Sequence, residues 1–224
     1  SVLMVGADNA SENLLRAGRV NVYIKPSTFE KKLQTEELTQ RSKFYGDDTS
    51  AGDYFGVSIA MNPQGDYAIV GACYDDDKGD NAGACYAFAR VGHTWVQKFK
   101  FYANNGKPGD MFGLSVAMTL DGDRVFVGAP SADTDGRVTS GAIYVFDREG
   151  EVWRQRGIPY AVDAATSNNG RIFGRSVACS GNGAHILVGC SAADQFTGGV
   201  ASGVVFYLTY DGTFFTEKQR FWSS

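Results

Sequence analysis

The chain has 224 residues, 43% of them hydrophobic and 13% aromatic, so it can bury a sizeable core and a disordered composition is excluded. Its 21 basic and 25 acidic residues give a formal net charge of -4, which lacks the basic footprint that nucleic-acid binding needs. No apolar run reaches the roughly 18 to 20 residues of a transmembrane segment, and the 28 glycines are spread as in a turn-rich β protein rather than a helical one.

The beginning of the chain carries three segments that are typical of β-strands, being rich in β-branched and aromatic residues. They are Val2–Ala7, Gly18–Ile24 and a strand expected after the aromatic Phe29. These three segments match the second, third and fourth elements of a phrase that recurs further along the chain. The first copy of the phrase therefore lacks its first strand.

The middle of the chain holds two complete copies of this phrase, and each copy predicts four short strands. In the first copy they are Asp53–Ala60, Tyr67–Ala72, Gly83–Phe88 and Trp95–Phe101, and in the second they are Asp110–Ala117, Val125–Ala129, Gly141–Phe146 and a strand from Trp153. The order is constant: Phe-Gly-x-Ser, then Val-Gly-Ala, then a strand opened by glycine, then an aromatic residue followed by alternating polar and apolar residues.

The end of the chain holds a third complete copy. Its strands are Arg171–Ala178, Ile186–Cys190, Gly203–Leu208 and Phe214–Phe221. The phenylalanines Phe55, Phe112 and Phe173 recur 57 and 61 residues apart. Four short antiparallel strands in a repeat of this size predict the blade of a β-propeller, in which the Phe-Gly pair packs between blades.

These motifs resemble the FG-GAP repeats of integrin-α-like β-propellers, named for pairs such as Phe112-Gly113 and the triplet Gly128-Ala129-Pro130. The order of the motifs is most similar to bacterial and protist surface-protein versions of the family. The resemblance covers nearly the whole chain. It implies an all-β fold, a β-propeller of four-stranded FG-GAP blades, of which this chain covers about four with the first incomplete.

The repeat divides the single propeller segment 1–224 into four parts. Blade 1 is partial and spans 1–45, and the complete blades span 46–104, 105–165 and 166–224. Members of the family usually have about seven blades, and a propeller is stable when its ring closes and leaves no long unpaired edge. We therefore expect the ring to be completed by further sequence of a longer protein, with completion by another chain as the alternative.

The resemblance also implies a partner-binding face. In integrin-like members this face carries the loops between second and third strands and the connectors between blades. The residues predicted to form it here are Asp8, Tyr45, Asp47, Asp75, Asp76, Asp77, Asp133, Asp135 and Asp194. The sequence thus predicts an anionic recognition surface without a visible deep pocket.

A bound metal is not expected. Integrin-like members bind calcium in Asp-rich loops between the first and second strands, whereas the corresponding turns here are short and poor in carboxylates. The remaining calcium candidates are Asp75, Asp77 and Asp80, which share a loop with Lys78. A solvated acidic loop is the favoured interpretation, so no cofactor is predicted.

Enzyme activity is not expected either. The pattern Gly-x-Ser-x-Ala at Ser58, Ser115 and Ser176 is similar to the nucleophile elbow of hydrolases. It recurs with the blades, however, and it lacks the strand-to-helix context of that motif. The histidines His93 and His185 supply no shared base to these serines.

Two covalent features are predicted from short motifs. Cys73 and Cys85 flank the loop between two strands of one blade, so they could face each other and form a disulfide. Asn9 begins the triplet Asn-Ala-Ser, an acceptor for N-glycosylation in a loop expected to be exposed. The triplet favours a secreted setting.

Together these features predict a non-enzymatic propeller located outside the cell or on its surface, with no transmembrane segment in this chain. Its expected function is protein-protein interaction, as an adhesion module or as a structural unit of a surface assembly. The alternative is a carbohydrate-binding, lectin-like propeller, because fungal lectins with related repeats hold sugars between blades. The scarcity of aromatic residues on the predicted loops disfavours a glycan partner.

Overall fold

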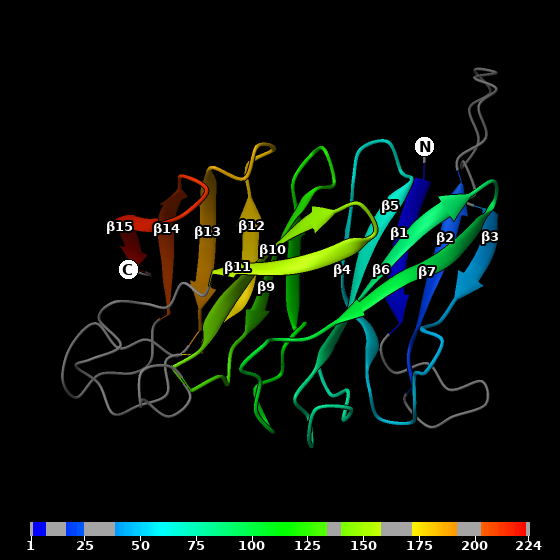
Figure 1. The fold of residues 1–224 in the computed structure, drawn as a ribbon, viewed down its shortest axis with the longest axis horizontal. Coiled ribbons are helices and arrows are strands. Elements are labelled where there is room, and N and C mark those ends of the chain that lie inside the picture. The colour runs from blue at the N-terminus through cyan, green and yellow to red at the C-terminus, as the bar shows by residue number, and fades with distance from the viewer. Residues whose placement is uncertain are drawn as a thin grey trace.

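The computed structural model describes residues 2–7, 17–24, 39–133, 140–157, 172–191 and 203–222. Within these ranges every regular element is a β-strand, and fifteen strands follow one another along the chain (Figure 1). The described part of the chain contains no helix of the length and apolar character needed to cross a membrane. The all-β fold predicted from the repeats is confirmed.

The strands form four antiparallel sheets, in each of which neighbours in sequence pair with one another. Blade 1 contains β1 (Val2–Ala7), β2 (Arg19–Ile24) and β3 (Thr39–Phe44), and blade 2 contains β4 (Phe55–Met61), β5 (Tyr67–Ala72), β6 (Ala84–Val91) and β7 (Thr94–Phe101). Blade 3 contains β8 (Ser115–Met118), β9 (Arg124–Ala129), β10 (Ala142–Glu149) and β11 (Val152–Gly157), and blade 4 contains β12 (Phe173–Cys179), β13 (His185–Cys190), β14 (Val204–Tyr210) and β15 (Phe215–Trp222).

Some predicted strand boundaries differ from the observed ones. The first strand of blade 2 begins at Phe55 rather than Asp53, because the backbone turns at Tyr54, which has a φ of 58°. Met111 has the same φ before the first strand of blade 3. In blade 1 the last strand is β3, while Phe29 lies outside the described residues.

The middle strands of a blade are buried on both sides, since alternate side chains face the two neighbouring blades. All six residues of β5 are buried. Ala68 and Val70 pack in a core cluster with Val20 of blade 1, whereas Ile69 packs in the next cluster with Phe112 of blade 3. The hydrophobic core is therefore divided among the interfaces between blades.

The Phe-Gly pairs join each blade to the preceding one. The backbone N–H of Phe112 donates to the carbonyl of Ala82 in blade 2 at 3.0 Å, and the Phe112 ring lies edge-on to Tyr144 within blade 3. The hydroxyl of Ser58 donates to the carbonyl of Gly113 at 2.7 Å. The serine of the repeated Gly-x-Ser pattern thus holds the next blade in place in this interface.

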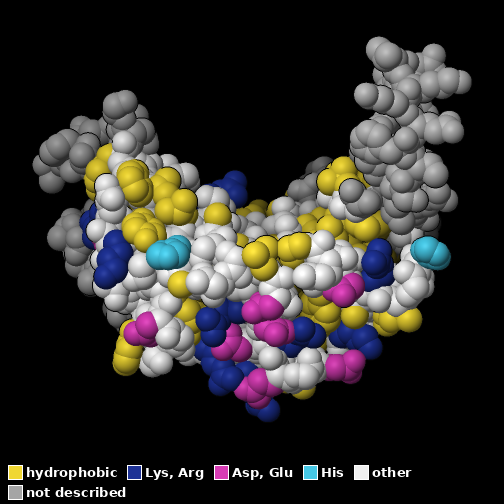
Figure 2. Space-filling model, turned by 90° about the horizontal axis from the view of Figure 1, so that it is seen from above, with side chains coloured by type: hydrophobic (Ala, Val, Ile, Leu, Met, Phe, Trp, Pro, Cys, Tyr) yellow, Lys and Arg dark blue, Asp and Glu magenta, His cyan; other side chains and the backbone are white. Residues whose placement is uncertain are grey.

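The four blades lie side by side in an arc, with blade 1 and blade 4 at its ends (Figures 1 and 2). The first strands of consecutive blades contact one another along the inside of the arc, as β4 contacts β8 and β8 contacts β12. This arrangement places the turns of all blades at two opposite ends. One of these ends carries most of the residues predicted to bind a partner.

Candidate partner-binding face

The predicted partner-binding loops of blades 2 and 3 are held together by backbone hydrogen bonds. The β5–β6 loop bonds to the connector before β4, where the N–H of Tyr74 donates to the carbonyl of Asp53 at 3.2 Å. It also bonds to the connector after β7, where the N–H of Gly109 donates to the carbonyl of Asp80 at 2.8 Å. The loops therefore form one continuous surface rather than separate tips.

Several of the predicted residues are exposed on this surface, namely Tyr45, Asp47, Asp76 and Asp77, while Asp133 is half-buried. Asp75 differs, because only 2% of it is exposed. Its predicted place on the recognition surface is therefore wrong, and the residue belongs to the interior of the loop. The candidates Asp8, Asn9, Asp135 and Asp194 lie outside the described residues.

Lys100 lies at the centre of the acidic loops. Its Nζ is 2.8 Å from carboxylate oxygens of Asp48 and of Asp75, and 2.7 Å from one of Asp77. The hydroxyl of Tyr86 lies 2.9 Å from Asp75. We call these five residues, together with Tyr102, whose hydroxyl donates to Asp77 at 2.8 Å, the Lys100 cluster. The cluster ties two loops to strand β7.

The surroundings of the Lys100 cluster stabilise the charged forms of Lys100 and Asp77 and the neutral form of Tyr86. Burial alone would lower the pKa of Lys100, but hydrogen bonds to the carboxylates raise that pKa above its ordinary value. The hydrogen bond from Lys100 in turn lowers the pKa of Asp77. Burial raises the pKa of Tyr86, so this phenol stays protonated. The ion pair between Lys100 and Asp77 is therefore kept at neutral pH.

The three calcium candidates are not brought together as one set of ligands. Asp75 and Asp77 both contact the ammonium group of Lys100, whereas Asp80 accepts a hydrogen bond from the side chain of Asn81 at 2.8 Å. An ammonium group thus occupies the space between the two carboxylates that a cation would need. Among the described residues, no group of three or more acidic, histidine or cysteine side chains is arranged to hold a metal ion.

Sequence reasoning missed Lys100 and Asp48, although a comparison of repeats contains a signal for the lysine. The N–H of the glycine before the third strand donates to Asp75 in blade 2 and to Ala132 in blade 3, so these two residues are equivalent. Five residues after the tryptophan of the fourth strand, blade 2 has Lys100 and blade 3 has Ile158. An acid and a base therefore occur together in blade 2 where blade 3 has two apolar residues.

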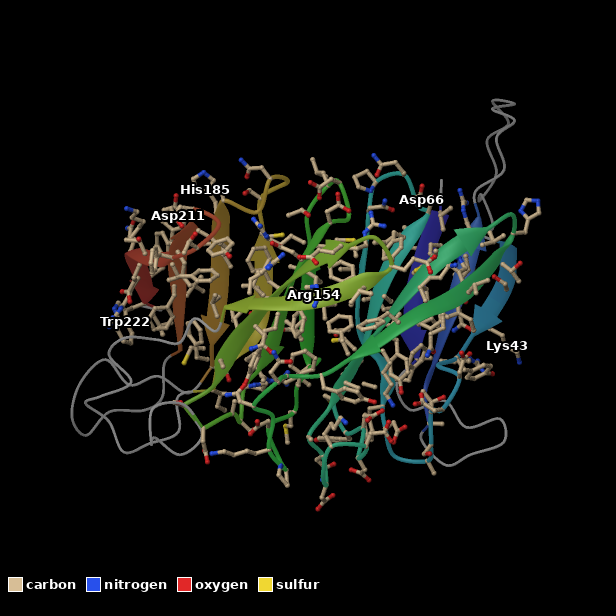
Figure 3. All side chains as sticks on the ribbon, viewed as in Figure 1. Lys43, Asp66, Arg154, His185, Asp211 and Trp222 are labelled. Atoms are coloured by element: carbon tan, nitrogen blue, oxygen red, sulfur yellow. The ribbon has the colours of Figure 1, made fainter. Side chains whose placement is uncertain are left out.

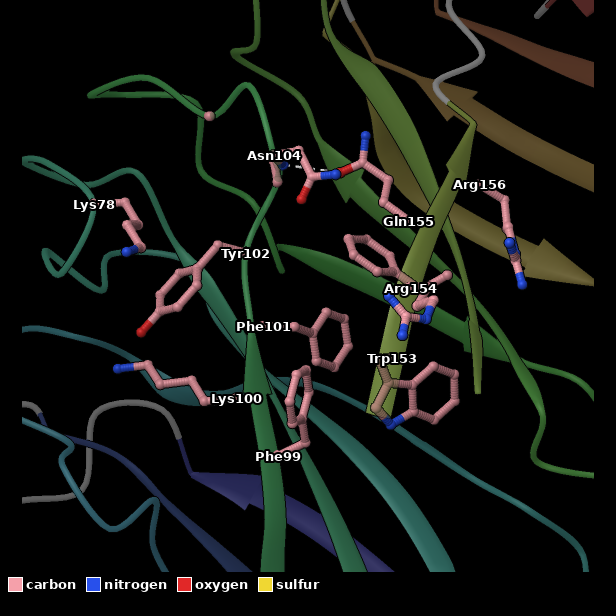
Figure 4. A pocket seen from close by; sticks show the side chains of 13 residues that line it. Lys78, Phe99, Lys100, Phe101, Tyr102, Asn104, Trp153, Arg154, Gln155 and Arg156 are labelled. Carbon is pink, nitrogen blue, oxygen red and sulfur yellow. Dashed lines mark hydrogen bonds between the residues drawn. The ribbon is translucent and has the colours of Figure 1, made fainter. Parts of the chain in front are cut away.

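A pocket of about 670 Å³ lies beside the Lys100 cluster, between β7 of blade 2 and β11 of blade 3 (Figure 4). Its lining combines aromatic rings with amides and cations, namely Phe99, Phe101, Tyr102, Trp153, Asn104, Gln155, Lys78, Lys100, Arg154 and Arg156. The side chain of Gln155 accepts the backbone N–H of Asn104 at 2.8 Å. The outer strands of two blades thus form a pocket at the border of the predicted face.

The cysteines of blade 2 are not joined in a disulfide, which corrects the predicted pairing. The register places Cys85 opposite Gly71, and Ala84 opposite Ala72. Cys73 follows the end of β5, so it is diagonal to Cys85 rather than opposite to it. Diagonal neighbours in a sheet are about 7 to 8 Å apart, which exceeds the reach of a disulfide without backbone movement.

The acid of the Asp-x-Phe-Gly motif fixes the connector before each Phe-Gly pair. A carboxylate oxygen of Asp53 accepts the N–H of Ser50 at 2.6 Å, and one of Asp110 accepts the N–H of Lys107 at 2.8 Å. Burial raises the pKa of Asp53 to about 6 and also raises that of Asp110. These buried acids border the partner-binding face.

Asp53→Asn is expected to remove part of the pH dependence of stability. Because the pKa of Asp53 rises from 3.8 to about 6 on folding, its stabilising contribution is complete below pH 3.8 and is lost as the pH rises through 6. The corresponding free energy is about 3 kcal/mol. Urea unfolding between pH 4 and pH 7 should show a stability loss in the native chain that the variant lacks. An identical pH slope in both proteins would contradict this assignment.

Comparisons with known proteins agree with this fold. A model of the FG-GAP repeat matches residues 38–88 and 95–146. A search among curated proteins finds no match. The solved structure of a protein provisionally described as a 6-phosphogluconolactonase, from Bacteroides uniformis, matches with a TM-score of 0.58 and 13% identity. The match covers 92% of this chain and 49% of that one, so the chain spans about half the length of that protein, and the likeness shows the fold alone.

Proposed function

This chain belongs to the FG-GAP repeat family, and on that premise we propose that it is a non-enzymatic module that binds other proteins outside the cell or on its surface. It acts there as an adhesion module or as a structural unit of a surface assembly. The family supports this proposal, since FG-GAP propellers generally bind proteins and typically occur in extracellular proteins. The opposing possibility of enzyme activity rests on a solved structure at 13% identity, which carries fold information only.

The observation that carries the proposal is the acidic surface formed by loops of blade 2. Asp47, Asp76 and Asp77 are exposed there on loops that backbone hydrogen bonds hold in place. Lys100 neutralises only part of the local charge, because it contacts three carboxylates at once. A preformed surface of this sign attracts a basic partner and limits the entropy lost on binding.

The test is binding of the immobilised chain to a panel of purified matrix and cell-surface proteins. The variant D47N/D76N removes two exposed carboxylates of the face, and we expect it to weaken each interaction that the native chain shows by at least tenfold. The hydrogen bond that Asp76 accepts from the N–H of Asn81 is available to asparagine as well. Binding of the native chain should also weaken as salt rises.

The matched control is D66N/E151Q, which removes the same number of carboxylates from turns at the other end of the blades, where Asp66 is labelled in Figure 3. It should bind as the native chain does. Equal losses in both variants would indicate a nonspecific charge effect, and the absence of any protein ligand in the panel would count against the interaction module.

Carbohydrate binding is the second candidate, and the pocket between β7 and β11 favours it. Tyr102 supplies an aromatic ring there, while Asn104 and Gln155 supply amide groups (Figure 4). A glycan array decides between the two functions. Specific glycan binding that Tyr102→Ala abolishes and D47N/D76N leaves intact would favour the lectin-like function. Protein binding that D47N/D76N weakens and Tyr102→Ala leaves intact would favour the interaction module.

A further inference from the structure

The pocket between β7 and β11 has a fixed width, because two contacts join the strands that form it. Lys98 on β7 pairs with Glu151 at 3.1 Å, and the N–H of Asn104 donates to the side chain of Gln155 at 2.8 Å. The pocket has a volume of about 670 Å³. This volume is within the range of roughly 300 to 1,000 Å³ that is typical of sites for small ligands.

The floor of the pocket is aromatic and contains a hydrogen-bond donor without an acceptor. Trp153 is stacked on Phe101, with ring centroids 5.8 Å apart, and only 4% of it is exposed. Among the described residues, no atom accepts a hydrogen bond from its Nε1. Figure 4 shows the nitrogen-bearing edge of this ring turned toward Phe99 on β7. A buried indole N–H usually has a hydrogen-bond partner, so this donor indicates a ligand that supplies an acceptor.

The charges on the side chains that line the pocket have one sign. Four of the described lining residues are cationic, and none of them is a carboxylate. Lys100 is engaged by the carboxylates of its cluster, and Arg154 pairs with Glu149 on β10. In the described part of the chain, the ammonium group of Lys78 has no carboxylate within 4 Å and lies 5.0 Å from the centroid of the Tyr102 ring. The rim of the pocket therefore attracts negative charge.

The lining is rich in hydrogen-bond donors and poor in side-chain acceptors. Lysine, arginine and the indole N–H only donate. The side-chain oxygen of Gln155 already accepts the N–H of Asn104, and the hydroxyl of Tyr102 donates to Asp77 outside the lining. A neutral sugar donates through each of its hydroxyl groups, whereas a carboxylate only accepts. The pocket therefore suits an acidic ligand better than a neutral one.

We infer that this pocket is a binding site for an aromatic carboxylate. The ring of the ligand packs against Phe101, and Phe99, which is half-buried, turns aside to admit it. The carboxylate accepts the N–H of Trp153, and the cations Lys78 and Arg154 attract it from the rim. The inference depends neither on the acidic face nor on its protein partner. It assigns the pocket to a ligand class other than the glycans of the second candidate function.

The test uses the indole N–H signals of the full chain in a proton–nitrogen NMR correlation spectrum. The chain has three tryptophans, Trp95, Trp153 and Trp222, so three such signals are expected. Titration with phenylacetate should shift the Trp153 signal downfield in a saturable way, because its N–H gains an acceptor. Trp95, which is stacked on Phe44 in the preceding interface, provides a signal that should not shift. The neutral analogue phenylacetamide should bind at least tenfold more weakly.

Two variants and a matched control locate the site by calorimetric titration with phenylacetate. Trp153→Phe keeps an aromatic ring and removes the N–H, so binding should weaken at least tenfold. K78Q/R154Q should weaken binding to a similar extent, and it changes only exposed side chains, so it tests the site independently of any loss of packing in Trp153→Phe. The control K107Q/K218Q removes two exposed positive charges outside the pocket and should bind as the native chain does.

The peptide Ala-Ala-Ala-Phe with a free carboxyl group distinguishes the end of a protein chain from a free aromatic acid, and a saturable Trp153 shift with either probe supports the inference. Three results would overturn it. They are the absence of a saturable shift with both acids, equal binding of phenylacetate and phenylacetamide, and a shift produced by methyl glucuronide alone, which would favour carbohydrate binding. D47N/D76N should still bind phenylacetate, so failure of the proposed protein binding is distinguishable from failure of this inference.

Discussion

Replacing Lys100 by methionine is expected to destabilise the fold by about 3 to 5 kcal/mol, because it leaves the buried carboxylate of Asp75 without its ion-pair partner. Only 9% of the Lys100 side chain and 2% of that of Asp75 are exposed, so water cannot replace the lost contact. Asp48 and Asp77 would lose the same ammonium group and repel each other. The partner-binding loops would lose these ion pairs with β7, while the N–H of Asp47 would keep its hydrogen bond to the side chain of Gln97 on that strand.

A double-mutant cycle measures this coupling. The variant D75A/K100M replaces the pair by apolar residues, the residue types that the sequence has at the corresponding positions of the next repeat, Ala132 and Ile158. It should recover most of the stability that Lys100→Met loses, with a coupling free energy of about 2 to 3 kcal/mol in urea unfolding. The hydroxyl of Tyr86 would retain a partner in Asp48 at 3.0 Å. Additive effects of the two single changes would contradict the role assigned to the cluster.

The matched control for this cycle is Lys98→Met. Lys98 lies two residues earlier on the same strand and pairs with Glu151, whose side chain is 75% exposed. An ion pair in contact with solvent contributes about 0 to 1 kcal/mol, so this variant should unfold close to the native midpoint. A loss as large as that of Lys100→Met would mean that any cation on β7 stabilises the blade equally.

Gly83→Ala is expected to cost more than about 4 kcal/mol, a size typical of severe steric conflict in a core. The residue has a φ of 86°, a conformation that costs an L-amino acid about 1 to 2 kcal/mol. Its Cβ would also lie 2.1 Å from the backbone carbonyl of Phe112, which no side-chain rotation can relieve. Blades 2 and 3 would have to separate, and the pocket between their outer strands would change shape.

Two other glycines separate the steric cost from the conformational one. Gly92 has a φ of 63° and no atom within 4 Å of an added Cβ, so Gly92→Ala should cost only about 1 to 2 kcal/mol. Gly203 is equivalent to Gly83, but among the described residues the atoms nearest to an added Cβ lie 3.3 Å or more away and belong to blade 4 itself, so Gly203→Ala should resemble Gly92→Ala. Equal unfolding midpoints for all three variants would show that contact between blades does not determine the cost.

The repeated motifs made the fold predictable because they act locally. A glycine at a positive φ, an alternating strand and a Phe-Gly pair each specify nearby backbone, and their recurrence at Phe55, Phe112 and Phe173 made chance unlikely as an explanation. The boundaries were less certain, since Asp53 lies in a turn and not in the strand that its motif begins. The disulfide prediction was wrong for a related reason. The spacing of Cys73 and Cys85 along the chain does not show whether the strand register places them opposite each other or diagonally.

The sequence by itself determined the architecture of this protein: all-β, with four-stranded blades that meet through Phe-Gly pairs. Only the tertiary structure decided which charges belong together and where the surface is hollow. Lys100 is 25 residues from Asp75 and 52 from Asp48, and nothing in their local sequence indicates that they meet. Backbone conformation follows from neighbours along the chain, whereas ion pairs and pockets depend on side chains that converge from separate loops and blades.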